Sequence, residues 1–195
     1  MSSRRSELQR QTTETDITVS LDLDHYEPGV VETGIGFLDH MLLTLARHAH
    51  FGLELKCAGD LQIDDHHTAE DCGLALGAAL DGALAERRGI VRFGHACAPL
   101  DEALARAVID LSGRPLAIVD LGLRRERIGG LSCENVGHVL RSLATSARAT
   151  VHIDVIRGEN DHHKAEAAFK AFALALRQAT RLDGDDRVPS TKGVL

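Results

Sequence analysis

Asp65-His66-His67-Thr68-Ala69-Glu70 is the stretch on which the fold depends, because it returns as Asp161-His162-His163-Lys164-Ala165-Glu166 with five of six positions identical. The repeat extends upstream, where His40 precedes His66 by 26 residues and His138 precedes His162 by 24. A repeat of this kind indicates two copies of one supersecondary unit that bury their apolar faces against each other. Each half of the chain therefore offers three histidines and one glutamate in the same order.

The hydrophobic pattern predicts a similar order of elements in each half. Strict alternation over residues 12–24 indicates a half-buried strand, and apolar residues at a period of 3.6 indicate helices. Asp65 and Asp161 are suitable N-caps, whereas residues 1–9 are polar and we expect them to be mobile. The predicted strands are 12–24, 30–32, 53–57, 61–63, 91–98, 103–111, 116–120 and 150–156, and the predicted helices are 37–50, 66–87, 133–147 and 162–181.

The helices cluster after the strands rather than alternating with them strictly, which predicts an α+β fold. We expect an internally duplicated two-layer fold in which each half is a mixed sheet with two helices on one face. Residues 1–89 form the first half-repeat and residues 90–187 the second, with no linker long enough to separate them, so the chain is one structural domain overall. Residues 188–195 are too rich in Pro and Gly for a helix and form a C-terminal tail.

Composition and charge limit the classes of function. The net charge of -7 argues against nonspecific binding to nucleic acid. The longest apolar runs fall far short of the roughly 18 residues that a membrane span needs, so we expect no membrane partner. The four cysteines include no C-x-x-C pair, and we interpret them as reduced thiols of a cytoplasmic protein.

The repeated histidines have the spacing of metal ligands. The first histidine of each copy and its glutamate are four residues apart and share a helix face, so they can hold one ion. The second histidine differs from the first in direction by about 100° and points elsewhere. This indicates two metal centres, each with ligands from both halves of the chain or from two subunits. The candidate ligands are His40, His66, His67, Glu70, His138, His162, His163 and Glu166.

The ligand inventory also indicates which metal is suitable. Six imidazoles and two carboxylates, shared equally, give three His and one Glu per ion. A set of nitrogen and oxygen donors without thiolate suits Mn, Fe, Co or Ni. If the coordination is octahedral, it favours Mn over Zn, which prefers tetrahedral coordination. The repeat could instead serve folding alone, but folding does not require histidine at six matched positions.

Other candidates have two readings each. Arg10 and Glu14 could form a surface ion pair, and Asp101-Glu102 could be catalytic but has more the character of solvated charge. Arg92 and Arg114 could bind an anion or pair with acidic residues. Ser190 and Lys192 have the chemistry of a phosphate clamp, but also that of an ordinary disordered end.

Six segments, two of which contain the His-His pair of the repeated motif, match a known family. They are Arg10-Gln11-Thr12-Thr13-Glu14-Thr15, Gly34-Ile35-Gly36-Phe37-Leu38-Asp39-His40-Met41, His66-His67-Thr68-Ala69-Glu70-Asp71, Asp110-Leu111-Ser112-Gly113-Arg114-Pro115, Asn160-Asp161-His162-His163-Lys164-Ala165-Glu166 and Pro189-Ser190-Thr191-Lys192-Gly193-Val194-Leu195. Together they resemble imidazoleglycerol-phosphate dehydratase, a family of histidine biosynthesis, over nearly the whole chain. The chain departs from the family pattern at Gly137 and Val139-Leu140, where an acidic residue and aromatic residues are frequent.

The resemblance implies a lyase that dehydrates D-erythro-imidazole glycerol phosphate to imidazole acetol phosphate. It also implies two Mn(II) ions per active site that bind the substrate imidazolate, halves like the second domain of ribosomal protein S5, and a 24-subunit assembly built from trimers. The eight candidate ligands above carry over as metal ligands. The substrate-binding residues carried over are Glu14, Arg92, Arg114, Ser190 and Lys192, so the tail would contribute to the site.

Glu14, Glu70 and Glu166 are the candidate catalytic residues. Glu14 comes first for acid/base work, because it is the one matched carboxylate outside the metal set. Two other classes of function stay open from the residues alone. A dinuclear phosphoester hydrolase usually brings bridging aspartates, and a ferritin-like storage site uses Glu-x-x-His rather than the His-x-x-x-Glu found here. We expect a single activity, since no phosphatase-like segment precedes the first strand.

Overall fold

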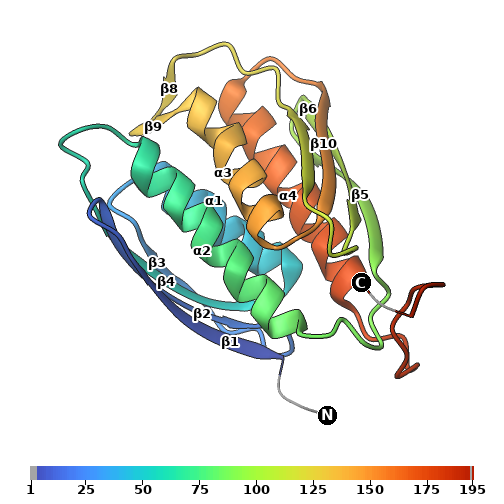
Figure 1. Cartoon of the computed structure of the whole chain (residues 1–195). Helices are drawn as coiled ribbons and strands as arrows, with labels where there is room; N and C mark the ends of the chain where they lie inside the picture. The colour runs from blue at the N-terminus through green and yellow to red at the C-terminus, as the bar shows by residue number, and fades with distance from the viewer. Residues whose placement is uncertain (1–3, 194) are drawn as a thin grey trace.

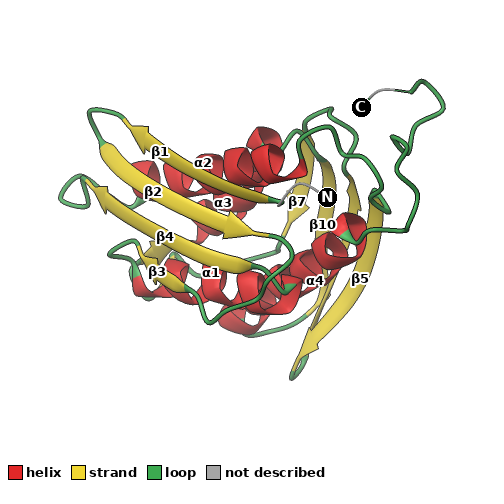
Figure 2. Ribbon diagram, turned by 90° about the horizontal axis from the view of Figure 1, so that it is seen from below, coloured by secondary structure: helices red, strands yellow, loops and turns green. Residues whose placement is uncertain are grey.

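Four helices lie between two four-stranded sheets, so the layers follow the order sheet, helices, helices, sheet (Figure 1 and Figure 2). This computed structural model describes residues 4–193 and residue 195. Residues 1–3 and 194, which belong to the predicted first half-repeat and tail, lie outside the described part. Among the helices that are described, none is both long and apolar enough to cross a membrane.

The first half forms one sheet with two helices on its inner face. The sheet has the strand order β1-β2-β4-β3, in which β3 is parallel to β4 and the other pairs are antiparallel. The elements are β1 (Arg5–Gln11), β2 (Thr15–Asp22), β3 (Val30–Glu32), α1 (Gly36–Ala49), β4 (Gly52–Gly59) and α2 (His66–Leu84).

The second half repeats this arrangement. Its sheet has the order β5-β6-β10-β7, with β7 parallel to β10 and the other pairs antiparallel. The elements are β5 (Phe93–Leu100), β6 (Ala103–Asp110), β7 (Leu116–Asp120), β8 (Arg127–Ile128), β9 (Leu131–Ser132), α3 (Cys133–Ser146), β10 (Thr150–Arg157) and α4 (Asp161–Thr180). The predicted duplicated α+β fold, with two helices on one face of each mixed sheet, is therefore confirmed.

The core follows from the sequence periodicity. In β2 the alternating residues Thr15, Ile17, Val19 and Leu21 are buried and their neighbours are not. The buried apolar residues of both halves form one continuous cluster, dominated by Leu, Ala, Val and Ile. Each large aliphatic side chain buried in it contributes about 1.5–3 kcal/mol relative to exposure. The many alanines of α2 and α4 let these helices pack closely on sheets and on other helices.

Some local expectations are wrong. Residues 5–9 are not mobile, because the edge strand β1 is ordered by backbone pairing with β2 rather than by an apolar pattern. The predicted strand over residues 61–63 is a turn, in which Ile63 donates its N–H to the Asp60 carbonyl and its side chain is exposed. Leu61 and Ile63 have the alternation of a strand, but no strand in the described part of the chain pairs with this segment. The short β8–β9 hairpin was not predicted.

The helix caps also differ from expectation by one position. The carboxylate of Asp65 makes no cap hydrogen bond, and Asp161 is already the first residue of α4. Asp64 Oδ1 accepts the N–H of His66 at 2.8 Å, and Asn160 Oδ1 accepts the N–H of His162 at 2.9 Å. The capping oxygen thus precedes the first histidine of each repeat by two residues, and Asp65 and Asp161 remain available for other contacts.

Helices α2 and α3 approach each other closely at two glycines. A Cβ added at Gly77 would lie 2.3 Å from the Leu143 carbonyl oxygen and 2.8 Å from Ser146 Cβ. One added at Gly73 would lie 2.7 Å from the Val139 carbonyl oxygen. Backbone atoms cannot yield as flexible side chains do, so these positions fix the distance between the two helices.

We expect Gly77→Ala to lower the free energy of unfolding by about 1–3 kcal/mol, because the added methyl group must push α2 and α3 apart. Denaturant titration followed by circular dichroism measures the loss. Gly36→Ala is the matched control, since a Cβ at Gly36 meets no atom within 4 Å. Equal stability of the two variants would show that the helices are not held at contact distance.

Candidate metal centre and active site

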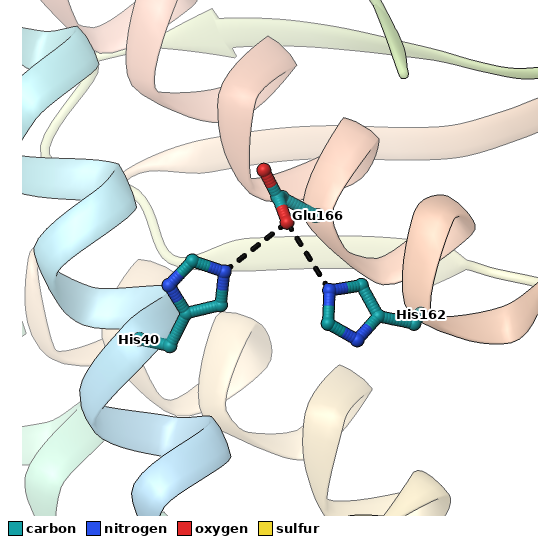
Figure 3. Close-up of side chains that lie close together, drawn as sticks. All are labelled: His40, His162 and Glu166. Atoms are coloured by element: carbon teal, nitrogen blue, oxygen red, sulfur yellow. Dashed lines mark hydrogen bonds and ion pairs between the residues drawn. The ribbon is translucent and has the colours of Figure 1, made fainter. Parts of the chain in front are cut away.

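The first turns of α2 and α4 meet the histidines of α3 and α1, and two clusters result. Cluster A consists of His40 on α1 with His162 and Glu166 on α4. Glu166 Oε2 lies 3.1 Å from His40 Nε2 and 3.3 Å from His162 Nε2, so the carboxylate sits between the two rings (Figure 3). Phe37 packs against the His162 ring with centroids 5.1 Å apart and limits its movement.

Cluster B consists of His66 and Glu70 on α2 with His138 on α3. The two imidazole rings stack with centroids 4.9 Å apart, and Glu70 carboxylate oxygens lie 3.7 Å from His66 Nε2 and 3.3 Å from His138 Nε2. His66 Nδ1 lies 3.1 Å from the Asn135 amide oxygen. That contact leaves Nε2 of His66 facing the cluster.

Each cluster takes residues from both halves. α1 packs on α4, so His40 of the first half reaches residues of the second, and α2 packs on α3, so His138 of the second half reaches residues of the first. The two clusters are therefore equivalent under exchange of the half-repeats. Neither half on its own contains a full three-residue cluster.

The electrostatics of cluster A favour an ionised glutamate. Burial would raise the pKa of Glu166, but the Lys170 ammonium, 2.7 Å from Oε1, and the His40 contact outweigh burial and hold the pKa at about 2. The carboxylate is thus negatively charged at neutral pH and is available to a cation.

The clusters have the donor chemistry and spacing of metal ligands. Donor atoms bound to one ion at about 2.1 Å lie roughly 3 Å apart when they occupy neighbouring positions. In both clusters the glutamate oxygens lie 3.1–3.7 Å from the histidine nitrogens, and all the donor atoms of a cluster lie within 4.8 Å of one another. Within the described part of the chain, the buried Nε2 of His138 makes no hydrogen bond, and its 3.3 Å contact with Glu70 Oε1 lacks hydrogen-bond geometry. A buried ring nitrogen that makes no hydrogen bond is costly unless it receives a ligand, so cluster B fits a cation.

His67 and His163 lie outside both clusters. The 100° step between adjacent helical residues sends them to a different side of the helix from His66 and His162, and their ring planes make angles of 77° and 90° with those of the two neighbours. His67 contacts Asp60 and Glu14, and its hydrogen bond with Asp60 raises its pKa.

The second repeat has an analogous contact. His163 Nδ1 lies 2.6 Å from Glu102 Oε2, and this contact raises the pKa of His163 and lowers that of Glu102 to about 2. Sequence reasoning treated Asp101-Glu102 as solvated charge, whereas Glu102 is bonded to the motif. It also missed Asp60 and Asn135 as histidine partners. The only signal was their position beside the ends of predicted strands and helices.

Glu14 is placed beside His67 by a network at the start of β2. Arg10 does not pair with Glu14, because its guanidinium binds the buried Asp71 of α2 at 2.7 Å. The Thr15 hydroxyl donates to the same carboxylate. The β1–β2 hairpin is thereby tied to α2, and Glu14 Oε1 lies 3.6 Å from His67 Nε2.

The aspartates that open each repeat anchor the segment between β7 and α3. Asp65 accepts hydrogen bonds from the backbone N–H and hydroxyl of Ser132 and from the Asn135 amide. Asp161 accepts the backbone N–H groups of Arg124 and Arg125 and pairs with Lys164 at 2.8 Å. Burial would raise the pKa of Asp161, but these contacts hold it at about 2. The segment between β7 and α3 is therefore hydrogen-bonded to the N-terminal ends of both α2 and α4.

Arg92 and Arg114 come together with the tail at the opposite end of α4. Arg92 forms two hydrogen bonds with Asp110 and donates to the Pro189 carbonyl oxygen at 2.7 Å. Arg114 is 68% exposed and its guanidinium lies 3.7 Å from Asp110. Ser190 follows Pro189 directly, and its hydroxyl oxygen accepts the N–H of Lys192. The residues expected to bind phosphate thus share one region.

That region and the clusters are far apart on one chain. The N–H of Arg92 bonds to the Ala179 carbonyl oxygen near the end of α4. His162 is the second residue of the same helix, and 17 residues of helix span about 25 Å. The structure therefore brings Glu14 close to the repeated motif, but it does not bring Arg92, Arg114, Ser190 or Lys192 there.

Fold and site together define an internally duplicated α+β protein with two matched histidine–glutamate clusters at its helix starts. The family model for imidazoleglycerol-phosphate dehydratase matches residues 33–176. The imidazoleglycerol-phosphate dehydratase of Candida glabrata is 56% identical over 206 residues, which cover 96% of this chain and 98% of that protein.

Two solved structures have the same fold. Imidazoleglycerol-phosphate dehydratase from Staphylococcus aureus superposes with a TM-score of 0.83 at 38% identity, covering 91% of this chain and 99% of the other. The enzyme from Pyrococcus furiosus gives 0.83 at 39% identity, covering 96% and 100%. The chain belongs to the imidazoleglycerol-phosphate dehydratase family. It is accordingly an enzyme, a lyase of histidine biosynthesis.

Proposed function

We propose that this enzyme dehydrates D-erythro-imidazole glycerol phosphate to imidazole acetol phosphate, and that it uses two Mn(II) ions per active site. The observation that carries the proposal is the pair of clusters A and B, each with two imidazoles and one carboxylate, in a chain of this family. Mixed N and O donors without thiolate suit Mn(II) in octahedral coordination better than tetrahedral Zn(II).

Each cluster would hold one ion and would need one more imidazole. Clusters A and B supply two His and one Glu each, and His67 and His163 are the remaining members of the eight-residue set. Among the described residues, both lie outside the clusters of their own chain and contact other carboxylates instead. We therefore propose that they serve ions held by other copies of the chain, which makes self-assembly part of the site.

The substrate explains why metals would be needed. The hydrogen to be removed lies on a glycerol carbon without an adjacent carbonyl group, so the imidazole ring must supply electrons to expel the neighbouring hydroxyl group. Bound ions would act as Lewis acids that favour the anionic form of this ring. Glu14 is the proposed proton carrier, because it is the matched carboxylate outside both clusters and its side chain is about half exposed. Glu70 and Glu166 are the alternative acid/base residues.

Arg92, Arg114, Ser190 and Lys192 are the proposed phosphate ligands, and the tail 188–195 would thereby contribute to the site. A clamp on the phosphate orients the glycerol arm for proton removal. Since these residues lie about 25 Å from the clusters of their own chain, one substrate must contact residues of different copies. A symmetric assembly of 24 subunits built from trimers meets this need. We also propose a cytoplasmic location, which the four free cysteines support.

Removal of divalent metal should abolish ketone formation, and Mn(II) should restore it, because the imidazole ring loses its electron acceptors. The measurement combines metal analysis of the protein with an assay that separates imidazole acetol phosphate from inorganic phosphate. Full dehydration by a metal-stripped sample would contradict the proposal. Phosphate release without ketone would indicate a hydrolase instead.

We expect Glu14→Gln to reduce kcat by roughly 10²–10⁴-fold, the range for loss of a general acid/base group, while the bound Mn(II) per chain stays unchanged. Steady-state kinetics and metal analysis of the same sample measure both quantities. Glu7→Gln is a suitable control, since Glu7 lies on β1 and is 69% exposed. Wild-type turnover in Glu14→Gln would exclude Glu14 as the proton carrier.

A further inference from the structure

His67 and His163 are each held at the same ring nitrogen by a carboxylate that lies outside the repeated motif. Asp60 Oδ2 lies 3.0 Å from His67 Nδ1. Glu102 Oε2 lies 2.6 Å from His163 Nδ1. A carboxylate accepts a hydrogen bond but donates none when it is ionised, so both contacts place the ring proton on Nδ1. The lone pair of each neutral ring is then on Nε2.

The Nε2 atoms face a different environment. His67 Nε2 lies 3.6 Å from Glu14 Oε1, and His163 Nε2 lies 3.8 Å from Asp101 Oδ2, and both of these carboxylates are more exposed than those at Nδ1. Each ring thus presents its lone pair to the more exposed carboxylate and its N–H to the less exposed one. A histidine that ligates a metal through one nitrogen usually donates its other N–H to such a partner.

Backbone hydrogen bonds hold both residues in place, Asp60 through its main chain and Glu102 through its carboxylate. The N–H of Asp60 donates to the Glu14 carbonyl oxygen, and its own carbonyl accepts the N–H of Ile63, so Asp60 is held in the turn after β4. Glu102 Oε1 accepts the N–H groups of Glu159 and Asn160. Its other oxygen is therefore held in a set position against His163, at the start of α4.

Duplication does not account for this agreement between the halves. Asp60 follows β4, and the residue that follows β10 is Gly158. Glu102 directly precedes β6, as Glu14 precedes β2, yet Glu14 lies at Nε2 of its histidine and Glu102 at Nδ1. Two different positions of the half-repeat thus reach the same ring nitrogen. What the halves share is the orientation of the second histidine.

We infer that Asp60 and Glu102 are positioning residues that fix the tautomer and direction of His67 and His163, so that each presents Nε2 to a metal ion bound by a neighbouring copy. This inference rests on the proposed function, because it assigns the remaining imidazoles to metals. It adds two residues that touch neither substrate nor metal and act through the ligands. Loss of either carboxylate should free its ring to rotate and to exchange the proton between nitrogens.

The test compares Mn(II) binding to the full-length assembly for Asp60→Ala, Glu102→Ala and the amide variants Asp60→Asn and Glu102→Gln. Free aqua Mn(II) is followed by continuous-wave EPR, and bound imidazole by the nitrogen modulation in pulsed EPR. We expect the alanine variants to lose about 10–100-fold in Mn(II) affinity, as for other outer-shell partners of metal ligands, with a weaker imidazole modulation. The amide variants keep the shape and an acceptor oxygen, so their affinity should fall between wild type and alanine.

Glu86→Ala is the matched control, since Glu86 is 80% exposed and its carboxylate lies 3.9 Å from Arg88, far from the motif in sequence. It should bind Mn(II) as wild type does. Wild-type affinity and modulation in both alanine variants would overturn the inference. If an alanine variant fails to fold, its amide counterpart decides, and wild-type Mn(II) affinity there would overturn the inference equally.

The outcomes separate this inference from the proposed function. If the unaltered protein binds Mn(II) and forms ketone while the four variants match it, only the positioning role fails. If the unaltered protein binds no Mn(II), the proposed function fails and the inference fails with it.

Discussion

Close packing between helices of opposite halves is the constraint on which the rest of the structure depends. α2 meets α3 across Gly73 and Gly77, where an added methyl group would strike backbone atoms, and α1 packs against α4. These contacts carry His138 onto the first turn of α2 and His40 onto that of α4. The duplication therefore does more than repeat a motif, because each cluster exists only when the halves are packed together.

Electrostatics at these helix starts work in two directions. The partial positive charge of a helix N-terminus disfavours a cation there. Carboxylates offset this effect: Glu166 and Glu70 lie within the clusters, and Glu14, Asp60 and Glu102 lie around the second histidines. A positive helix end also favours the neutral imidazole that a metal requires, whereas the carboxylates of Asp60 and Glu102 raise the pKa of His67 and His163 and favour the protonated ring. The arrangement thus places anionic oxygen beside imidazole nitrogen, which is the donor set proposed for Mn(II).

The sequence was sufficient for the architecture and for the choice of candidate ligands. The repeated motif and the alternation of β2 predicted the duplication and most elements, and the 100° step along a helix predicted that adjacent histidines diverge. Strand β1 was missed because an edge strand is ordered by backbone pairing. Residues 61–63 were misassigned because Leu61 and Ile63 alternate as in a strand, although no strand that the structure describes pairs with them. Asn135 and Glu102 could not be predicted, since they lie 69 and 61 residues from the histidines that they contact. The contact of Asp60 depends on the shape of the turn after β4, where a strand was expected.

The distance between the clusters and Arg92 was also beyond sequence reasoning, because a local pattern says nothing of how far apart two sites lie in space. It has a direct consequence for the proposed function. A substrate that binds a cluster through its ring and Arg114 through its phosphate must contact two copies of the chain. Symmetric homo-oligomers provide repeated interfaces of this kind, so the proposed function makes catalysis depend on self-assembly.

The most direct test of this claim is complementation between two inactive variants, His40→Ala and Arg114→Ala, co-expressed with different tags and purified as mixed assemblies. If each site takes its cluster from one copy and its phosphate ligands from another, random mixing leaves about one quarter of the sites intact, and that fraction of wild-type dehydratase activity should return. If each site were confined to one chain, every site would carry one of the two substitutions. Mixed assemblies as inactive as the separate variants would contradict the account.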